Sequence, residues 1–96
     1  MTNPIGKPVI VRTQSAGVHF GYLERRDGKE VQLTRSRRIW RWYGANSCSG
    51  LASTGLDVKK SSVAAPVNIV LTEAIEIIDC TPEAVASIES ATWTAS

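Results

Sequence analysis

The residues best suited to chemistry lie in one basic and aromatic segment that begins at Arg35 and ends at Gly50. Four arginines and three large aromatic residues fall within its first nine positions. Arginine offers a planar fork of donors that matches phosphate, and an indole or phenol ring offers a surface on which a base can stack. The segment therefore predicts a site for a flat, negatively charged ligand such as a nucleotide.

A helix that begins directly after the aromatic residues would complete this site. Asn46 or Ser47 can cap such a helix, whose free backbone N–H groups and positive dipole end attract phosphate. We expect the arginines to contact phosphate, the rings to stack on a base and small polar side chains to supply hydrogen bonds. The predicted ligand-binding residues are Arg37, Arg38, Trp40, Arg41, Trp42, Tyr43, Asn46, Ser47 and Ser49.

Two alternatives explain the same segment without a ligand. Trp40 or Trp42 could anchor the core while the arginines extend outward over the aromatic faces. The segment could instead form an interface between copies of the chain, because Trp, Tyr and Arg are enriched at interface hot spots. A pocket between subunits would combine ligand and interface, and we expect a homo-oligomer.

The remaining residues offer little catalytic or metal-binding chemistry. A single histidine on a strand, here His19, more often has a structural role, and no serine has a histidine partner at a diagnostic spacing. Gly44 to Gly50 lacks the ending of a phosphate-binding Walker loop. Cys48 and Cys80 lie far apart in sequence and are expected to be reduced thiols in small apolar spaces. We therefore expect a non-enzymatic protein without a metal or cofactor.

Charge is divided unevenly along the chain, although the formal net charge is only +2. Residues 1–60 hold all eleven basic residues and four acids, whereas residues 61–96 hold five acids and no Lys or Arg. The division suggests either an anionic ligand on the first part or pairing between the two parts, within one chain or between copies.

The residue pattern predicts an α+β fold, an antiparallel sheet of about five strands with two short helices. β-branched and alternating residues indicate the strands, and an Asp-Gly pair at residues 27–28 predicts a hairpin turn. Polar caps, a proline and a glycine mark the helix ends. The expected strands are 8–13, 17–23, 30–34, 38–43 after a break at 35–37, and 66–78 as one strand, two strands or a helix; the expected helices run from 46 or 47 to 55 and from 81 to about 90.

In a strand over residues 38–43, alternate side chains point to opposite faces. Arg38, Trp40 and Trp42 would share one face. Ile39, Arg41 and Tyr43 would share the other. With 96 residues the chain has room for one domain, residues 1–96, in which 1–6 and 92–96 are the segments that could fray. No apolar run is long enough for a membrane span and no secretion signal is visible, so we expect a cytoplasmic protein.

Several stretches resemble a family of small bacteriophage and prophage proteins of unknown function. They are residues 17–23, 28–33, 37–45 and 71–83, so the resemblance covers most of the chain. It implies an accessory phage protein in the host bacterial cytoplasm, with no catalytic residues to carry over. Small phage proteins of this kind often block host defences, some by sequestering nucleotide signals.

The leading hypothesis joins this context to the basic aromatic segment. The chain would bind and sequester a phosphate-bearing nucleotide signal and so antagonise bacterial defence. A nucleic-acid-binding module is a less favoured alternative, because only one strand and its preceding turn are strongly basic. A protein-binding inhibitor or small virion component that uses the Trp and Arg side chains is another.

Overall fold

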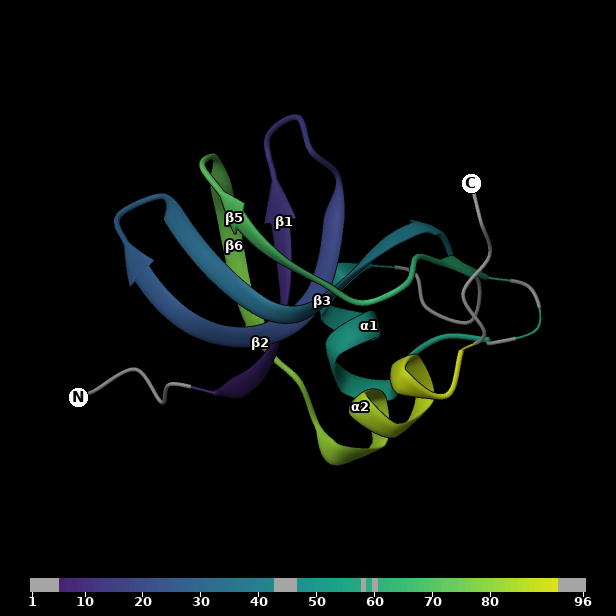
Figure 1. The fold of residues 1–96 in the computed structure, drawn as a ribbon. Coiled ribbons are helices and arrows are strands. Elements are labelled where there is room, and N and C mark those ends of the chain that lie inside the picture. Colours follow the sequence, from purple (N-terminus) through teal and green to yellow (C-terminus); the bar gives the residue numbers. More distant parts are fainter. Residues whose placement is uncertain (1–5, 43–46, 58, 60, 92–96) are drawn as a thin grey trace.

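Six strands and two helices make up the part of the chain that the computed structural model describes, residues 6–42, 47–57, 59 and 61–91. The strands form one antiparallel sheet in the order β4-β3-β2-β1-β6, with β5 also paired to β3 (Figure 1). The predicted α+β class is therefore confirmed. The elements are β1 (Lys7–Thr13), β2 (Val18–Asp27), β3 (Glu30–Arg41), α1 (Cys48–Thr54), β4 (Ser62–Val63), β5 (Val67–Leu71), β6 (Ala74–Asp79) and α2 (Pro82–Glu89).

The sheet curls because strands at its two ends are joined by a very short connection. β5 pairs with β3 and β6 pairs with β1, yet only Thr72 and Glu73 separate β5 from β6. The backbone N–H of Ala74 donates to the carbonyl of Lys29 at 3.1 Å, which ties β6 to the β2–β3 turn. Gly21 permits the curvature, since a Cβ there would lie 3.0 Å from the Leu33 side chain. Figure 1 shows the resulting bend of β2 and β3.

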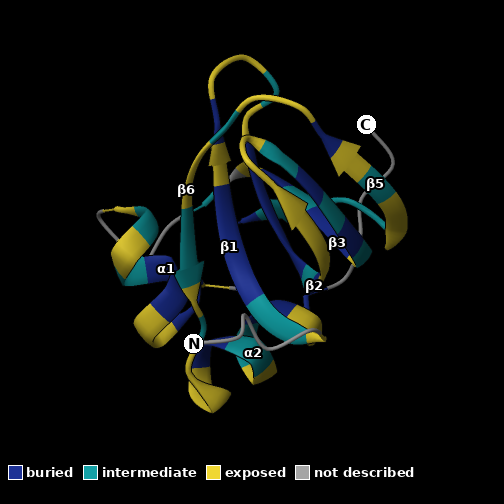
Figure 2. Cartoon of the chain, turned by 90° about the vertical axis from the view of Figure 1, so that its left-hand side faces the viewer, coloured by how far each residue is buried: buried dark blue, intermediate teal, exposed yellow. Residues whose placement is uncertain are grey.

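Each face of the curled sheet carries its own hydrophobic core. Along β1, Ile10 packs into one core while its neighbours Val9 and Val11 pack into the other, as strand alternation requires. We call the side that packs on α1 and α2 the helix face, and the side enclosed by the curl the inner face (Figure 2). The helix-face core contains Ile10, Val18, Phe20, Ile39, Leu51, Ala52, Leu56, Val63, Ile88 and Ala91, and the inner-face core contains Val9, Val11, Leu23, Val31, Leu33 and Leu71.

The predicted break at residues 35–37 is wrong, because β3 continues through it. Arg35 adopts a φ of 50°, and at this point β3 shifts its pairing register with both of its neighbours, β2 and β5. Such a bulge absorbs an extra residue without ending the strand. Pairing with β2 resumes at once, with Arg37 opposite Phe20.

The other local predictions are largely confirmed. Gly28, with a φ of 59°, turns the β2–β3 hairpin, and residues 66–78 form two strands. Ser47 caps α1 and Thr81 caps α2, each accepting a backbone N–H from three residues ahead. The short strand β4, which follows α1, is not among the expected strands. Residues 1–5 and 92–96, which cover most of the segments expected to fray, lie outside the described residues. No helix in the described ranges is long and apolar enough to cross a membrane.

Replacement of Gly55 by alanine should destabilise the protein by about 3 kcal/mol or more, because backbone strain and a steric clash add. Gly55 has a φ of 82°, and a Cβ there would lie 2.4 Å from the Cβ of Ser87 on α2. Gly6 is a matched control, with a φ of 85° and no atom within 4 Å of the added Cβ. Urea denaturation of Gly55→Ala and Gly6→Ala would measure both losses. Equal losses would show that a Cβ at residue 55 does not clash with Ser87.

Candidate functional site

The structure divides the predicted ligand-binding residues between the two faces of the sheet. Arg38 lies opposite His19, which in turn lies opposite the inner-face core residue Val11, so Arg38 belongs to the inner face. Arg37 points to the helix face. A second bulge, between Ile39 and Arg41, then changes the alternation. The prediction that Trp42 shares a face with Arg38 is wrong, because Trp42 packs against the helix-face core.

Arg37 is buried, and each of its three guanidinium nitrogens donates to a backbone carbonyl. Its Nε donates to Ala64 O at 2.8 Å, and its Nη2 donates to Ala91 O at 2.8 Å. Its Nη1 donates to Ile88 O at 3.1 Å and Glu89 O at 3.4 Å. These carbonyls include the end of α2, where the helix dipole is negative and the last turn has no basic residue of its own. Arg37 therefore fixes α2 on the sheet and has no free donor fork for phosphate, which removes it from the predicted ligand set.

Arg38 and Trp40 form a pair on the inner face. The Cζ of Arg38 lies 4.5 Å from the centre of the Trp40 ring, within cation–π range. Trp40 is 49% exposed, whereas Arg38 is half-buried and lies against Gly17, where an added Cβ would come within 3.5 Å of its guanidinium. Arg38 has no carboxylate within ion-pair distance among the residues that the structure describes. The pair thus joins an exposed ring to a positioned cation.

His19 lies opposite Arg38 on β2 and is buried, with 2% of its surface exposed. Its Nε2 lies 2.9 Å from Ala16 O, so Nε2 carries the proton of the neutral ring. Its Nδ1 is buried and has no partner in the described part of the chain. Burial lowers the pKa of His19, and the charge of Arg38 lowers it further, against the opposing effect of the Ala16 hydrogen bond. His19 is therefore a neutral neighbour of Arg38.

Trp42 lines a separate hollow of about 340 Å³ on the helix face. The guanidinium that lines this hollow belongs to Arg12, whose Nε donates to Glu76 Oε1 at 2.8 Å. A cation already paired with a carboxylate attracts a phosphate weakly, so this hollow suits a neutral ligand better than an anion. The lining residues are Arg12, Trp42, Ser47, Cys48, Ser49 and Glu76.

Of the remaining predicted residues, the two described serines do not join Arg38 and Trp40. Ser47 and Ser49 lie at the start of α1 beside Trp42, and the Ser47 hydroxyl is engaged as the helix cap. Burial raises the pKa of the half-buried Cys48 thiol in the same hollow. Tyr43, Asn46 and the side chain of Arg41 lie outside what the structure describes.

Sequence reasoning overlooked two polar groups that the fold assembles from distant elements. Arg12 forms an ion pair with Glu76 because β1 and β6 are neighbours. Lys7 and Asp79 form a second ion pair between the same strands, and both pairs join the basic part of the chain to its acidic part. The other group places the Arg35 guanidinium 3.8 Å from the centre of the Tyr22 ring. Burial, with a hydrogen bond from the Tyr22 hydroxyl to Glu89, raises the pKa of Tyr22 to about 12. Strand alternation in β1 was the only signal for Arg12.

Comparison with known proteins identifies a family but no activity. The family model described as "Domain of unknown function (DUF6948)" matches residues 6–88, most of the chain. No curated protein and no solved structure shows a match. The expected membership of a family of unknown function is confirmed, and a phage or prophage origin stays a prediction.

Replacement of Arg37 by methionine should lower the free energy of unfolding by about 3 kcal/mol, because it removes the side-chain donors of the carbonyls of Ala64, Ile88 and Ala91, of which that of Ile88 also accepts the backbone N–H of Ala91. Arg25→Met is the control, since Arg25 is exposed and makes a surface ion pair with Glu30, worth at most about 1 kcal/mol. Urea denaturation would compare the two variants. A loss no larger for Arg37→Met than for Arg25→Met would contradict the buried role of Arg37.

Protonation of His19 should destabilise the fold in mildly acidic solution. The pKa of His19 is lower in the folded chain than its ordinary value of 6.5, so the unfolded chain binds a proton first as the pH falls. Stability is therefore unaffected by His19 above about pH 6.5, and it decreases below that value until the pH reaches the lowered pKa. Urea denaturation between about pH 7 and about pH 5 should show a steeper loss for the wild type than for His19→Gln. Parallel curves would mean that His19 titrates normally.

Proposed function

We propose that this chain, which belongs to the DUF6948 family, is a binding module that holds a planar anion of the nucleotide type on Arg38 and Trp40. The observation that carries the proposal is the guanidinium of Arg38, set 4.5 Å from the centre of an indole ring that is 49% exposed. A base stacks on the accessible part of the indole. The phosphate accepts hydrogen bonds from the guanidinium.

The environment of Arg38 supports this role. Stacking on Trp40 and contact with the backbone at Gly17 restrict the guanidinium, so less side-chain entropy is lost when a ligand binds. The neutral His19 beside it does not compete for an anion and adds no repelling negative charge. No ion pair among the described residues occupies the guanidinium. These features distinguish Arg38 from Arg12, which is held by Glu76.

The binding free energy that one Arg38–Trp40 pair can supply is small, which argues for more than one copy of the chain around each ligand. One stacked base contributes about 1–3 kcal/mol. A charge-assisted hydrogen bond contributes about 1.5–3 kcal/mol. Their sum corresponds to dissociation constants between about 10 mM and about 50 μM. Sequestration of a scarce signal needs tighter binding, so we propose that a homo-oligomer brings two or more Arg38–Trp40 pairs to one ligand.

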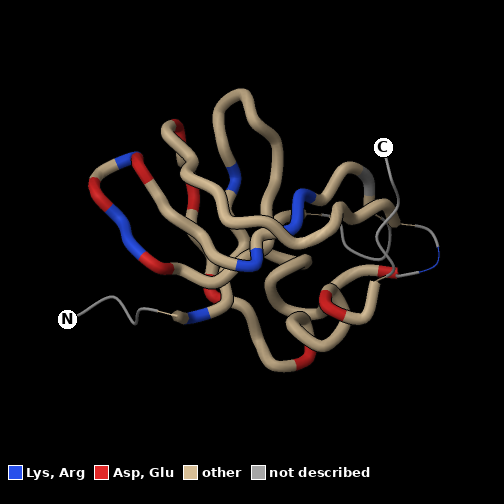
Figure 3. Tube along the Cα trace, in the orientation of Figure 1, with Lys and Arg blue, Asp and Glu red and all other residues tan. Residues whose placement is uncertain are grey.

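The biological part of the proposal comes from the resemblance to small phage and prophage proteins. In that setting the chain acts in the host bacterial cytoplasm and withdraws a phosphate-bearing nucleotide signal from a defence pathway, without converting it. A long nucleic-acid footprint is less well supported, because acidic residues alternate with basic ones on the β2–β3 hairpin (Figure 3). Phosphates along a strand would meet both charges there.

Calorimetry with mononucleotides and cyclic dinucleotides tests the site. Arg38→Ala and Trp40→Ala should each weaken binding by about tenfold or more, because each removes one of the two contacts. Arg35→Ala is the matched control, since Arg35 also stacks on an aromatic ring, that of Tyr22, and should bind normally. Wild-type affinity should fall with salt, and Arg38→Ala should show a smaller salt dependence.

Native mass spectrometry of the protein purified from bacterial cells would report copy number and retained nucleotide together. Unchanged nucleotide binding by both Arg38→Ala and Trp40→Ala would disprove this site. Binding of oligonucleotides in gel shifts without binding of mononucleotides or cyclic dinucleotides would favour the nucleic-acid alternative. Capture of a host protein that depends on Trp40, with no retained small molecule, would favour a protein-binding inhibitor instead.

A further inference from the structure

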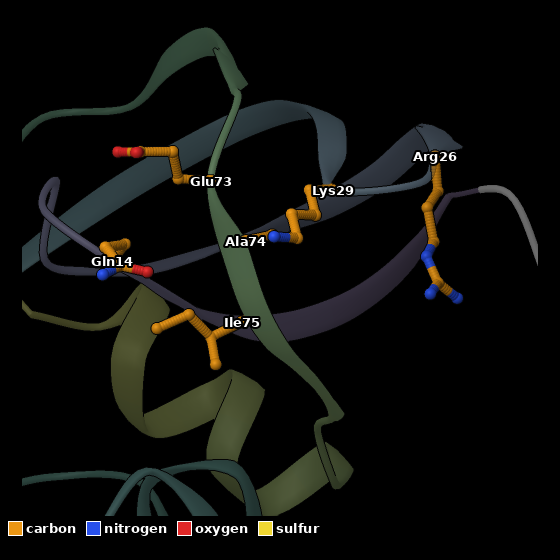
Figure 4. A pocket seen from close by; sticks show the side chains of 6 residues that line it. All are labelled: Gln14, Arg26, Lys29, Glu73, Ala74 and Ile75. Carbon is orange, nitrogen blue, oxygen red and sulfur yellow. The ribbon is translucent and has the colours of Figure 1, made fainter.

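The geometry points to a second ligand site, on a cavity of about 400 Å³ where three hairpins meet. We propose that it takes a small organic monoanion, a carboxylate with a short apolar part. Gln14 follows β1, Arg26 and Lys29 come from the β2–β3 hairpin, and the β5–β6 hairpin supplies the rest (Figure 4). The lining residues are Gln14, Arg26, Lys29, Glu73, Ala74 and Ile75.

Backbone hydrogen bonds hold the walls of this cavity together. The N–H of Gln14 donates to Glu73 O at 3.0 Å, and the N–H of Ala74 donates to Lys29 O at 3.1 Å. The three turns are therefore tied to one another, although their side chains are largely exposed. A ligand that binds between them meets a framework that is already formed, which reduces the entropy lost on binding.

The charges around the cavity select a single negative charge. In the described ranges, neither Arg26 nor Lys29 lies within ion-pair distance of a carboxylate, whereas the adjacent Arg25 pairs with Glu30 at 3.3 Å. The carboxylate of Glu73 accepts a hydrogen bond from the Ser15 hydroxyl at 2.7 Å and points away from Arg26 (Figure 4). Two cations against one acid leave a charge of +1. A carboxylate balances it, whereas a phosphate dianion would overcompensate it and has no apolar part to cover the exposed Ile75.

Ile75 and Gln14 provide the other contacts that such a ligand needs. Ile75 is 51% exposed although it belongs to a strand, so covering it removes apolar surface from water. The Gln14 amide can donate and accept hydrogen bonds at the same cavity. A volume of about 400 Å³ lies at the lower end of the range for small-molecule pockets. The site therefore combines a cationic end, an apolar wall and one amide.

A titration with benzoate, followed by the backbone amide resonances of Gln14, Ala74 and Ile75, tests the proposal. We expect saturable shifts for benzoate and none for benzamide, the neutral molecule of the same shape. Lys29→Ala and Arg26→Ala should each weaken benzoate binding by about fivefold, the effect of losing one solvent-exposed ion pair. Arg25→Ala on the same hairpin is the matched control and should bind benzoate as the wild type does.

A second comparison tests the apolar wall. Ile75→Thr keeps a β-branched side chain on the strand and should weaken benzoate binding while leaving acetate binding unchanged. Equal shifts with benzoate and benzamide, normal benzoate binding by Lys29→Ala, or tighter binding of inorganic phosphate than of benzoate would each overturn the proposal. The lining of this cavity includes neither Arg38 nor Trp40, so it is separate from the proposed nucleotide site. Arg38→Ala should therefore retain benzoate binding, and Lys29→Ala should retain nucleotide binding.

Discussion

A buried guanidinium fixes the arrangement on which the rest of this molecule depends. Arg37 carries a charge into the interior with no carboxylate within ion-pair distance among the described residues, and this is tolerable because the carbonyls of Ala64, Ile88, Glu89 and Ala91 accept its donors. Those carbonyls bring α2 and the segment after β4 to the same side of β3. Once Arg37 must face the helices, strand alternation turns its neighbour Arg38 to the opposite face. The demand of the core thus decides which of these two arginines stays outside the helix-face packing.

Most of the elements could be predicted because their signals are local. An Asp-Gly pair, two capping side chains and a Gly with positive φ act within a few residues, and they formed the expected hairpin and helices. The course of β3 could not be predicted in this way. Whether Arg35 ends a strand or forms a bulge depends on pairing with β5, more than thirty residues away. A local pattern contains no information about that partner.

In the candidate site, too, the local sequence indicates the residue types, whereas distant parts of the fold set their environments. Arg37 and Arg38 are adjacent and chemically identical, yet one is buried under helix carbonyls and the other stacks on an exposed indole. The basic aromatic composition predicted one site on this segment, but the bulge after Ile39 places Trp42 on the other face of the sheet from Arg38 and Trp40. Part of the charge asymmetry is likewise explained within the chain, since the neighbouring strands β1 and β6 pair Lys7 with Asp79 and Arg12 with Glu76.

The inner face also buries polar atoms at a cost in folding stability that packing alone does not explain. His19 Nδ1 and Ser36 Oγ are buried without a partner among the described residues, and a buried polar atom of this kind costs about 1–3 kcal/mol. His19 lies opposite Arg38, and Ser36 lies two positions before Arg38 on the same strand. Apolar residues at both positions would fill the core without this cost, as they do at Val11 and Leu33. Polar side chains are therefore concentrated beside Arg38, the half-buried arginine at which we propose that a ligand binds.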